Sequence, residues 1–385
     1  MKVCVDATSA ILEGGGIGRF SKMLCKYLPS IAPDINFVYY YYYFPLKYFF
    51  RYKKIPKVLN INKSNVSHVL FPMSRKIIDP LFSRLKVDHS LLYGKVDIFF
   101  APNYKYPDID NEIMIYTIHD LIGIKFREFV TDEMFRLSHF DIDRGIKRAD
   151  HIVTVSESSK RDIMECFGFP GENISVIYEG FEIVDVEDEK MYCDEEQNEE
   201  VQVDGDYILT VGSVEPRKNH IGLLKAYKIL LDKGYDIKLI IAGRRGWKNE
   251  LIFDAIRKLQ KTGMVQLILE MSDSELKKLY QNAFLFVFPS FYEGFGLPLL
   301  EASSHGLPVI CSNVSSMPEV MGDSALYVNP YEPEDIAEKM MMVIDDSELR
   351  VKLIEKGREN LKRFSWKKAA SDLADVFRKV YGQFH

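Results

Sequence analysis

The sequence predicts an α/β fold with a doubly wound, mostly parallel β-sheet in each half of the chain. Short apolar runs, typical of strands buried on both faces, alternate with helical patterns in both halves. With 385 residues the chain also exceeds the size at which single cores usually stop growing. A strongly acidic stretch near the middle separates the two patterns, so two domains are expected.

The composition excludes several classes of protein. The net charge of -6 argues against a general nucleic-acid binder, and 47% of the residues are apolar, enough for two cores. The five cysteines are scattered without a C-x-x-C pair, so neither a zinc site nor a disulfide framework is indicated. The first residues follow a strand pattern and lack the apolar core of a secretory signal peptide. No apolar run is long enough for a membrane span. We expect a cytoplasmic protein, peripheral at most on a membrane.

The first half opens with a strand over residues 3–6, a glycine-containing loop and a helical pattern over residues 20–28. A strand, a glycine loop and a helix start can hold a phosphate, because unpaired backbone N–H groups and the positive end of the helix meet there. Gly16 and Gly18 are therefore candidate phosphate-binding residues. Their spacing differs from the dinucleotide-binding fingerprint, and a flexible surface loop is the alternative.

An aromatic and basic region follows. The tyrosines at positions 39–43 are expected to finish a second strand, since aromatic residues suit strands. Residues 45–57 interleave aromatic and basic side chains and can lie on an anionic membrane surface; a core-packed helix with a solvated basic face is the alternative. Between positions 40 and 105, twelve Lys or Arg stand against three Asp, so an acidic partner can meet this half.

Two further central strands are expected over residues 96–101 and 113–118, and the second ends directly in His119 and Asp120. In open α/β sheets, ligands bind outside the carboxyl ends of the strands. His119 is therefore a candidate ligand-binding or catalytic residue rather than a structural histidine.

Two Asp-x-Asp triplets are candidate metal ligands, because such pairs can hold a divalent cation. Asp108 and Asp110 lie in a polar loop that enters a strand, at the wrong edge of the sheet. Asp141 and Asp143 fall within a helix expected over residues 132–148, where residues two apart do not share a face. Both triplets are interpreted as structural, and no metal site is predicted.

The domain boundary is expected in the acidic stretch. Residues 182–206 contain twelve Asp or Glu and one Lys, a composition that cannot bury much surface. The predicted organisation is a first domain over residues 1–182, an acidic linker over 183–206 and a second domain over 207–365.

The second half alternates strands and helices clearly. Strands are expected over residues 207–211, 238–242, 284–288 and 309–311, and helices over 219–231, 333–344 and 347–363. Ser272 and Glu275 form a capping-box pattern that opens another helix.

Arg217 and Lys218 follow the first strand of this half and precede a helix. At the carboxyl edge of a normally wound sheet they would lie near the loop after the strand over residues 284–288. Adjacent cations there can neutralise a diphosphate without a metal. A surface charge pair without a ligand is the alternative.

Residues 293–302 follow that strand and carry the strongest site pattern. The two glycines and Pro298, placed where a first helical turn tolerates proline, predict a loop that opens a helix, again a phosphate-binding arrangement. Glu293 and Glu301 bracket the loop, and carboxylates suit sugar hydroxyls. The combination indicates a ligand in which a sugar is joined to a phosphate; an ordinary connection between strand and helix is the alternative.

These motifs resemble those of the family 4 glycosyltransferases, or group 1 glycosyl transferases, of the GT-B fold. The resemblance spans nearly the whole chain and rests on the glycine stretch at 14–19, His119-Asp120, residues 155–158, residues 215–219 and the E-x7-E pattern from Glu293 to Glu301. It implies two Rossmann-like domains that face a central cleft, with the donor held mainly by the second and the acceptor by the first. It also implies transfer with retention of configuration and without a metal or cofactor.

The resemblance also implies roles for individual residues. Arg217 and Lys218 would bind the donor diphosphate, Glu293 the transferred sugar and Glu301 the ribose. Backbone N–H groups of the loop and helix start would face sugar and phosphate, from Gly294, Phe295, Gly296 and Leu297. His119 would lie by the reacting sugar, and Gly16 and Gly18 near the phosphates. Ser213 departs from the family pattern, where many members have arginine. The last helix, over residues 366–385, would cross back onto the first domain.

The expected activity is transfer of a hexose, with mannose and therefore GDP-mannose favoured, to a glycan or lipid-linked acceptor. The sequence of residues 215–219 is similar to that of many mannosyltransferases of polysaccharide assembly. The alternatives are a catalytically silent nucleotide-sugar-binding or scaffold protein, an enzyme of the same fold that uses a UDP- or ADP-sugar, and an epimerase or phosphorylase.

Overall fold

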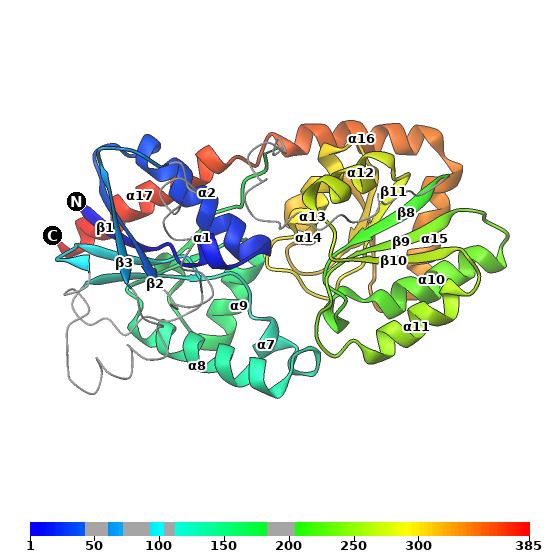
Figure 1. Cartoon of the computed structure of the whole chain (residues 1–385), viewed down its shortest axis with the longest axis horizontal. Coiled ribbons are helices and arrows are strands. Elements are labelled where there is room, and N and C mark those ends of the chain that lie inside the picture. Colours follow the sequence, from blue (N-terminus) through cyan, green and yellow to red (C-terminus); the bar gives the residue numbers. More distant parts are fainter. Residues whose placement is uncertain (43–60, 72–92, 104–111, 183–204) are drawn as a thin grey trace. The chain divides into compact units, whose positions relative to one another are not determined.

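The computed structural model describes residues 1–42, 61–71, 93–103, 112–182 and 205–385. The chain forms two compact units (Figure 1). The first contains Met1–Leu121, Arg136–Gly180 and Phe364–His385, and the second contains Ile122–Phe135 and Phe181–Arg363. Each unit is built around its own parallel sheet, as the sequence predicts.

The described part of the first unit holds a seven-stranded sheet of order β3-β2-β1-β4-β5-β6-β7, in which every pairing is parallel. The strands are β1 (Lys2–Asp6), β2 (Asn36–Tyr42), β3 (Val66–Phe71), β4 (Ile98–Ala101), β5 (Ile113–Ile118), β6 (His151–Thr154) and β7 (Ile174–Val176). Among its described residues this unit contains the helices α1 (Ser9–Leu12), α2 (Gly15–Ile31), α9 (Glu157–Phe167), α17 (Trp366–Phe384) and most of α8 (Asp132–Arg148), with a short turn η2 (Gly171–Asn173).

The tyrosine run forms part of β2, as predicted. Tyr39, Tyr40 and Tyr41 are each at most 1% exposed, because β2 is covered on both sides of the sheet. The Tyr39 hydroxyl donates to the Cys25 carbonyl of α2 at 2.7 Å, and the Tyr41 hydroxyl lies 3.0 Å from His68 Nδ1 on the neighbouring strand. Their hydroxyls therefore tie the strand to its surroundings.

The last helix packs within the first unit, where α17 lies beside α2 (Figure 1). Phe377 contacts Phe100 of β4 with ring centroids 5.4 Å apart, and Arg378 pairs with Asp34 at 2.8 Å. The chain leaves this unit after Gly180 and returns at Phe364, and a Cβ on Gly180 would lie 2.1 Å from the Trp366 nitrogen. Glycine is required there because the start of α17 passes so close.

One local prediction is wrong. The glycines at positions 15–18 were expected in a loop, but they form the first turn of α2, which begins at Gly15 rather than at Phe20. A Cβ on Gly18 would lie 1.9 Å from the Glu13 carbonyl oxygen. Close approach of the preceding backbone, not loop flexibility, explains the glycine at that position.

The second unit holds a six-stranded parallel sheet of order β10-β9-β8-β11-β12-β13. Its strands are β8 (Tyr207–Val211), β9 (Lys238–Gly243), β10 (Val265–Leu269), β11 (Leu285–Phe288), β12 (Val309–Ser312) and β13 (Ala325–Val328). Between residues 205 and 363 its helices are α10 (His220–Asp232), α11 (Glu250–Gln260), α12 (Asp273–Asn282), α13 (Leu297–Ser304), α14 (Met317–Met321), α15 (Pro333–Asp345) and α16 (Ser347–Leu361), with a turn η4 (Pro216–Lys218). Figure 1 shows α10 and α11 on one face of this sheet and α12, α13 and α16 on the other. The capping box of Ser272 and Glu275 is present at α12.

A segment from the first half of the sequence belongs to the second unit. Residues Ile122–Phe135, which we call the inserted segment, contain α7 (Ile122–Lys125), η1 (Arg127–Phe129) and the first turn of α8. Within the second unit, Trp247 Nε1 donates to the Phe129 carbonyl at 2.6 Å, and the Phe129 ring stacks on Phe291 with centroids 5.3 Å apart. Phe126 contacts Tyr292 at 5.4 Å. The loop after β11 therefore packs against a segment that the sequence places between β5 and β6.

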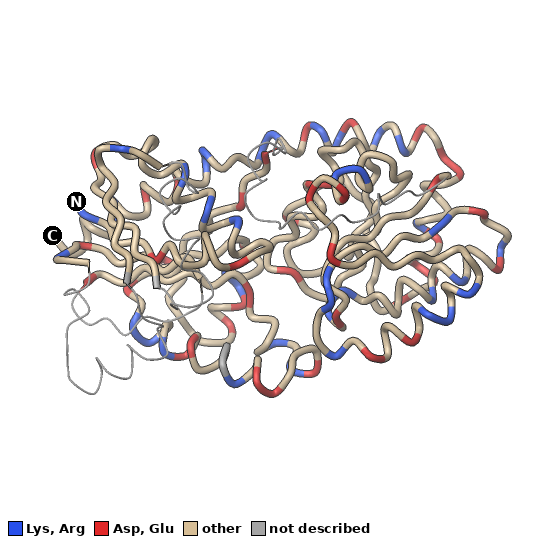
Figure 2. Tube along the Cα trace, viewed as in Figure 1, with Lys and Arg blue, Asp and Glu red and all other residues tan. Residues whose placement is uncertain are grey.

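Several predictions lie outside the described residues: the possible membrane-facing stretch over 45–57, the Asp108 and Asp110 triplet, and nearly all of the acidic linker. Most of the basic excess between positions 40 and 105 also falls there, drawn grey in Figure 2. Among the helices that the structure does describe, none combines the length and the apolar character needed to cross a bilayer.

Candidate functional site

The candidate site of the second unit forms where β8 and β11 lie side by side. From β8 the chain winds outward to β9 and β10, and it then returns to β11 and winds the other way. Such a switch point leaves a crevice at the carboxyl ends of the two central strands, where α/β proteins bind ligands. Arg217 and Lys218 follow β8, and Glu293 follows β11. The predicted proximity of the two loops is confirmed by direct contacts between them.

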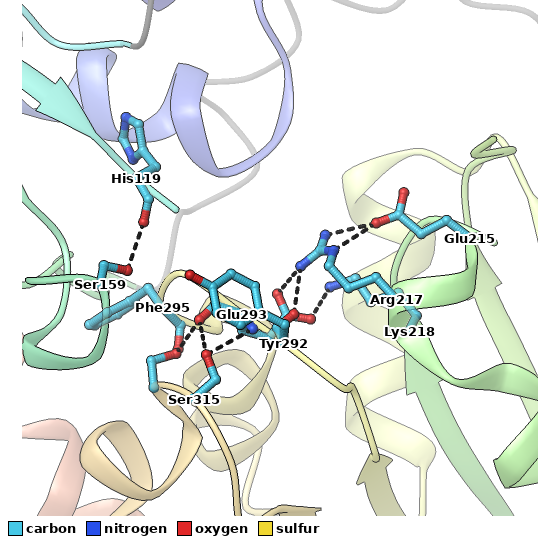
Figure 3. A network of polar contacts seen from close by, with 10 residues as sticks. His119, Ser159, Glu215, Arg217, Lys218, Tyr292, Glu293, Phe295 and Ser315 are labelled. Carbon is cyan, nitrogen blue, oxygen red and sulfur yellow. Dashed lines mark hydrogen bonds and ion pairs between the residues drawn. The ribbon is translucent and has the colours of Figure 1, made fainter. Parts of the chain in front are cut away.

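The Glu293 carboxylate forms ion pairs with both Arg217 and Lys218 (Figure 3). Arg217 Nη1 lies 2.5 Å from Glu293 Oε2, and Lys218 Nζ lies 2.7 Å from Glu293 Oε1. Arg217 also donates from Nε and Nη2 to Oε1 of Glu215, at 2.9 and 2.8 Å, and from Nη1 to the Tyr292 carbonyl at 3.1 Å. Two cations and two carboxylates thus form one compact cluster, in which Arg217 bridges the loops after β8 and β11.

Burial and mutual attraction set the pKa values in this cluster. Burial disfavours the charged form of Glu293, but Arg217 and Lys218 outweigh it, so the pKa of Glu293 lies below its usual value. Burial raises the pKa of Glu215 above its usual value despite the same two cations. Burial and the neighbouring Arg217 lower the pKa of Lys218. The cluster is therefore a place where an additional anion would find cations that are already desolvated.

The backbone after Glu293 is held by two serines. Ser315 Oγ donates to the Glu293 carbonyl at 2.6 Å and accepts from the Glu293 N–H at 3.2 Å. Ser316 Oγ, which is fully buried, donates to the carbonyls of Glu293 and Phe295 at 2.9 and 2.8 Å. Gly296 then takes φ = 107° as the N-cap of α13, with Pro298 in the first turn as predicted. The N-terminus of α13 opens at Leu297, in the same loop that carries Glu293.

Glu301 lies one turn further along α13 and is half-buried. Its Oε2 accepts a hydrogen bond from the Tyr280 hydroxyl of α12 at 3.0 Å. Glu293 and Glu301 consequently have different surroundings: the former is surrounded by cations, and the latter is held by a neutral donor. This difference agrees with different ligand groups for the two carboxylates.

His119 lies in the first unit, directly after β5, and is 6% exposed. Its Nε2 is 2.9 Å from the Pro102 carbonyl, which can only accept, so Nε2 carries the proton. Burial lowers the pKa of His119, which favours the neutral ring. Its backbone carbonyl accepts from Ser159 Oγ at 3.1 Å (Figure 3), and its ring packs edge-on against Phe20 of α2 at 5.0 Å. Nδ1 is 3.9 Å from Glu179 Oε1.

Gly16 and Gly18 belong to the same unit as His119. Both lie in the first turn of α2, and the backbone N–H of Gly16 is among those that a helix start leaves without an intrahelical partner. Through Phe20, two residues beyond Gly18, this helix also contacts the His119 ring. The unit therefore brings the glycine stretch and the histidine together, as their positions after β1 and β5 allow.

The Asp141 and Asp143 triplet lies in α8, which spans the predicted residues 132–148. Asp143 pairs with Lys147 one turn away at 2.7 Å, an ordinary helix-surface pair. Among the described residues no group of three or more His, Cys, Asp or Glu is arranged to hold a metal ion.

Sequence reasoning missed three residues that shape the site. Glu215, buried beside Arg217, had no role assigned, although it stands two positions before that arginine. Ser316 reaches the loop and Tyr280 reaches Glu301 of α13, each from another element, and no local signal points to them.

Two family models match the chain. The model described as "Glycosyl transferases group 1" matches residues 194–360, and the one described as "Glycosyltransferase Family 4" matches residues 14–184. Together they account for most of the chain, one in each half.

Curated relatives are similar over much of the chain. "O-antigen chain mannosyltransferase B" of Escherichia coli is 29% identical over 387 residues, covering 94% of this chain and 96% of that protein. "O-antigen chain mannosyltransferase RfbU" of Salmonella typhimurium is 31% identical over 239 residues, covering 62% of each chain.

Solved structures share the fold. Sucrose-phosphate synthase from Thermosynechococcus elongatus superimposes with a TM-score of 0.72 at 16% identity over 100% of both chains. Anabaena Alr3699/HepE in complex with UDP and glucose gives a TM-score of 0.69 at 17% identity, covering 98% of this chain and 100% of that one.

Proposed function

This chain belongs to the family 4, or group 1, glycosyltransferases of the GT-B fold and is a hexosyltransferase, and we propose that it transfers mannose from GDP-mannose to a glycan or lipid-linked acceptor. Transfer proceeds with retention of anomeric configuration and without a metal. The similarity to two mannosyltransferases of O-antigen chains supports the choice of donor and of a polysaccharide acceptor.

The observation that carries this proposal is the cluster at the switch point of the second sheet. The side chains of Arg217 and Lys218 are 15% and 10% exposed, and both pair with the carboxylate of Glu293, which lies in the loop that opens α13. A diphosphate needs such a set of charged and backbone donors, and the adjoining carboxylates suit sugar hydroxyls. In this assignment Glu293 serves the transferred sugar and Glu301 the ribose.

Charge development explains how these groups accelerate transfer. Cleavage of the bond between sugar and phosphate leaves negative charge on the departing diphosphate and positive charge on the anomeric carbon. Arg217, Lys218 and the N-terminus of α13 stabilise the first, and such preorganised donors are usually the largest single catalytic contribution. The Arg217 guanidinium is preorganised in this sense, because Glu215 and Glu293 hold it on two sides.

No residue is assigned as a covalent nucleophile. A departing phosphate oxygen can accept the proton of the acceptor hydroxyl on the face from which it leaves, which accounts for retention. His119 contributes as a neutral ring near the reacting sugar, consistent with the lowered pKa that burial gives it.

A donor screen tests the choice of GDP-mannose. GDP-mannose, GDP-glucose, UDP-glucose and ADP-glucose are added in turn to the full chain, and protection against thermal unfolding is measured. A ligand at a hundredfold over its dissociation constant adds about 2.7 kcal/mol to the unfolding free energy. GDP-mannose is expected to protect most. Stronger protection by a UDP- or ADP-sugar would overturn the donor assignment, and no protection by any of them would overturn the donor site itself.

Turnover is tested separately. Release of GDP from GDP-mannose in the presence of an O-antigen-type mannan acceptor, with and without EDTA, distinguishes transfer from binding. Acceptor-dependent release that EDTA leaves unchanged supports the proposal. Binding of the donor without release would favour a silent nucleotide-sugar-binding protein, and release that stops with EDTA would contradict metal independence.

A further inference from the structure

We propose that Tyr280 is a positioning residue for the donor ribose: its hydroxyl holds the Glu301 carboxylate in the orientation that receives the ribose hydroxyls. The inference rests on the proposed function, in which Glu301 binds that ribose. It adds a residue of α12, a helix that carries none of the other site residues, to the machinery of the donor site.

The contact is direct and spans two helices. The Tyr280 hydroxyl donates to Glu301 Oε2 at 3.0 Å, across 21 positions of the sequence. The Tyr280 side chain is 2% exposed, whereas Glu301 is half-buried. The hydrogen-bond donor is thus fixed in the interior while the residue that it holds is partly exposed, which is the arrangement expected of a support for a binding group.

The Tyr280 ring has little freedom to move. It stacks on His305 with centroids 5.4 Å apart and an interplanar angle of 15°, and it contacts Phe286 of β11 at 5.7 Å. His305 is fixed in turn, because its Nδ1 lies 2.9 Å from the Glu301 backbone carbonyl and must donate to it. The stack therefore joins Tyr280 to the same residue whose carboxylate its hydroxyl holds.

The helix that carries Tyr280 is also anchored. Its N-terminus has a complete capping box from Ser272 and Glu275, and the Tyr207 hydroxyl of β8 donates to the Leu279 carbonyl at 2.7 Å. The position of the Tyr280 hydroxyl is consequently set by the sheet rather than by a mobile surface helix.

The physical benefit is preorganisation. A glutamate side chain without a fixed partner loses rotamer freedom when it binds a ligand, and this loss weakens binding. A carboxylate has about four acceptor positions, so one hydrogen bond from Tyr280 leaves capacity for the vicinal hydroxyls of a ribose. Removal of the tyrosine hydroxyl should therefore weaken the contribution of the ribose hydroxyls and leave that of the base and the phosphates unchanged.

The test compares nucleotides that differ only in those hydroxyls. Dissociation constants are measured for GDP and 2′,3′-dideoxy-GDP, with the corresponding uridine and adenosine pairs in parallel, on the parent protein and on Tyr280→Phe. The parent should prefer the ribose form. Tyr280→Phe should lose roughly five- to tenfold of affinity for the ribose form, about the worth of one hydrogen bond, and bind the dideoxy form as the parent does.

Two further variants serve as the positive and the negative control. Glu301→Gln should also lose the preference for the ribose form. Tyr227→Phe removes another buried hydroxyl of the same unit, one that donates to the Ile237 carbonyl at 2.7 Å, and should keep the preference. Thermal unfolding of each variant shows that the fold is retained. A merely structural role of Tyr280 would weaken both nucleotide forms equally, so the ratio of the two constants is the deciding quantity.

The outcomes separate this inference from the function on which it rests. If Glu301→Gln loses the preference and Tyr280→Phe keeps it, the role of Tyr280 is overturned and the donor site stands. If Glu301→Gln keeps the preference, Glu301 is not at the ribose and the inference falls with that assignment. If the parent binds none of the nucleotides, the proposed function itself is overturned.

Discussion

Arg217 Nη1 donates to Glu293 Oε2 at 2.5 Å, although the two residues are 76 positions apart in the sequence. The pair joins the loops after the two central strands of the second sheet, and Lys218 shares the same carboxylate. Without a donor, the two cations are neutralised by protein carboxylates. A donor diphosphate would enter as an additional anion, so its affinity depends on how the cations divide their hydrogen bonds between it and Glu293.

Replacement of either cation should abolish most of the transfer activity. Lys218→Met keeps an unbranched apolar side chain but removes the charged Nζ, which lies 4.6 Å from the centre of the Phe288 ring. We expect this variant, and Arg217→Ala, to lower the transfer rate on the order of a hundredfold, the usual effect of removing one donor from a charge-stabilising site. Initial rates of sugar transfer measure it.

Lys228→Ala is the matched control. Lys228 lies on the next helix, is mostly exposed and pairs with Asp232 one turn away. Its loss should leave the rate unchanged. Rates of Lys218→Met and Arg217→Ala within a few-fold of the parent would show that these cations do not serve the departing diphosphate.

Glu293 and Glu215 should give the stability of the protein opposite dependences on pH. Because the pKa of folded Glu293 is lowered, its ionised form stabilises the fold above the pKa of an unfolded glutamate, about 4.3, and this contribution is lost as the pH falls through the folded pKa. Because the pKa of folded Glu215 is raised, protonation favours the folded state, and that contribution is lost as the pH rises through the folded pKa.

Urea unfolding midpoints of Glu293→Gln and Glu215→Gln, taken from neutral pH downward, test these signs. Glu293→Gln should flatten the decline of stability below about pH 4.3, whereas Glu215→Gln should remove a gain that develops on acidification above that pH. Parallel profiles for the two variants would contradict the opposite assignments.

Gly18 should tolerate no side chain. A Cβ there would meet the Glu13 carbonyl oxygen at 1.9 Å, so Gly18→Ala must displace backbone at the start of α2. Gly382→Ala is the matched control, because Gly382 is also helical and a Cβ there meets nothing within 4 Å. We expect Gly18→Ala to lower the melting temperature and Gly382→Ala to leave it equal or raise it, since alanine favours a helix by up to about 1 kcal/mol. Equal effects would refute the close-approach explanation.

Trp247→Phe should loosen the inserted segment. The substitution removes the 2.6 Å hydrogen bond from Trp247 Nε1 to the Phe129 carbonyl and should cost about 1 kcal/mol. Limited digestion with trypsin reports the effect, because Lys125 and Arg127 lie within the segment. Cleavage there should be faster in Trp247→Phe than in Lys248→Ala, which removes only the exposed contact to the Glu128 carbonyl. Identical cleavage of the two variants would show that the tryptophan does not hold the segment.

The parts of the fold and site that could be predicted from the sequence are those that depend on local pattern and strand order. The runs at 113–118 and 207–211 form β5 and β8 as expected, because continuous apolar stretches suit buried parallel strands. The proximity of Arg217 to Glu293 could be predicted because a parallel sheet places the carboxyl ends of its strands at one edge.

The remainder depends on tertiary contacts that no local pattern encodes. α2 begins at Gly15 although glycine has a poor intrinsic preference for a helix, and the close approach of Gly18 to the Glu13 carbonyl is a contact that the local pattern does not show. Burial of Glu215 against Gly246 and the hydrogen bond from Tyr280 to Glu301 depend on neighbours far along the chain. The roles assigned to all the site residues stay predictions, those of Arg217, Lys218, Glu293 and Glu301 as much as those of His119, Gly16 and Gly18.

The inserted segment also limits how the enzyme can be divided. Because Ile122–Phe135 packs with Trp247 and Phe291, the second unit is discontinuous in the sequence. A fragment that begins after the acidic stretch lacks the inserted segment and would expose the aromatic side chains that this segment covers. A fragment that ends before the acidic stretch contains the inserted segment but lacks Trp247 and Phe291, against which it packs. Chimeras and split versions of this transferase should therefore keep Ile122–Phe135 together with residues 205–363 from the same parent protein.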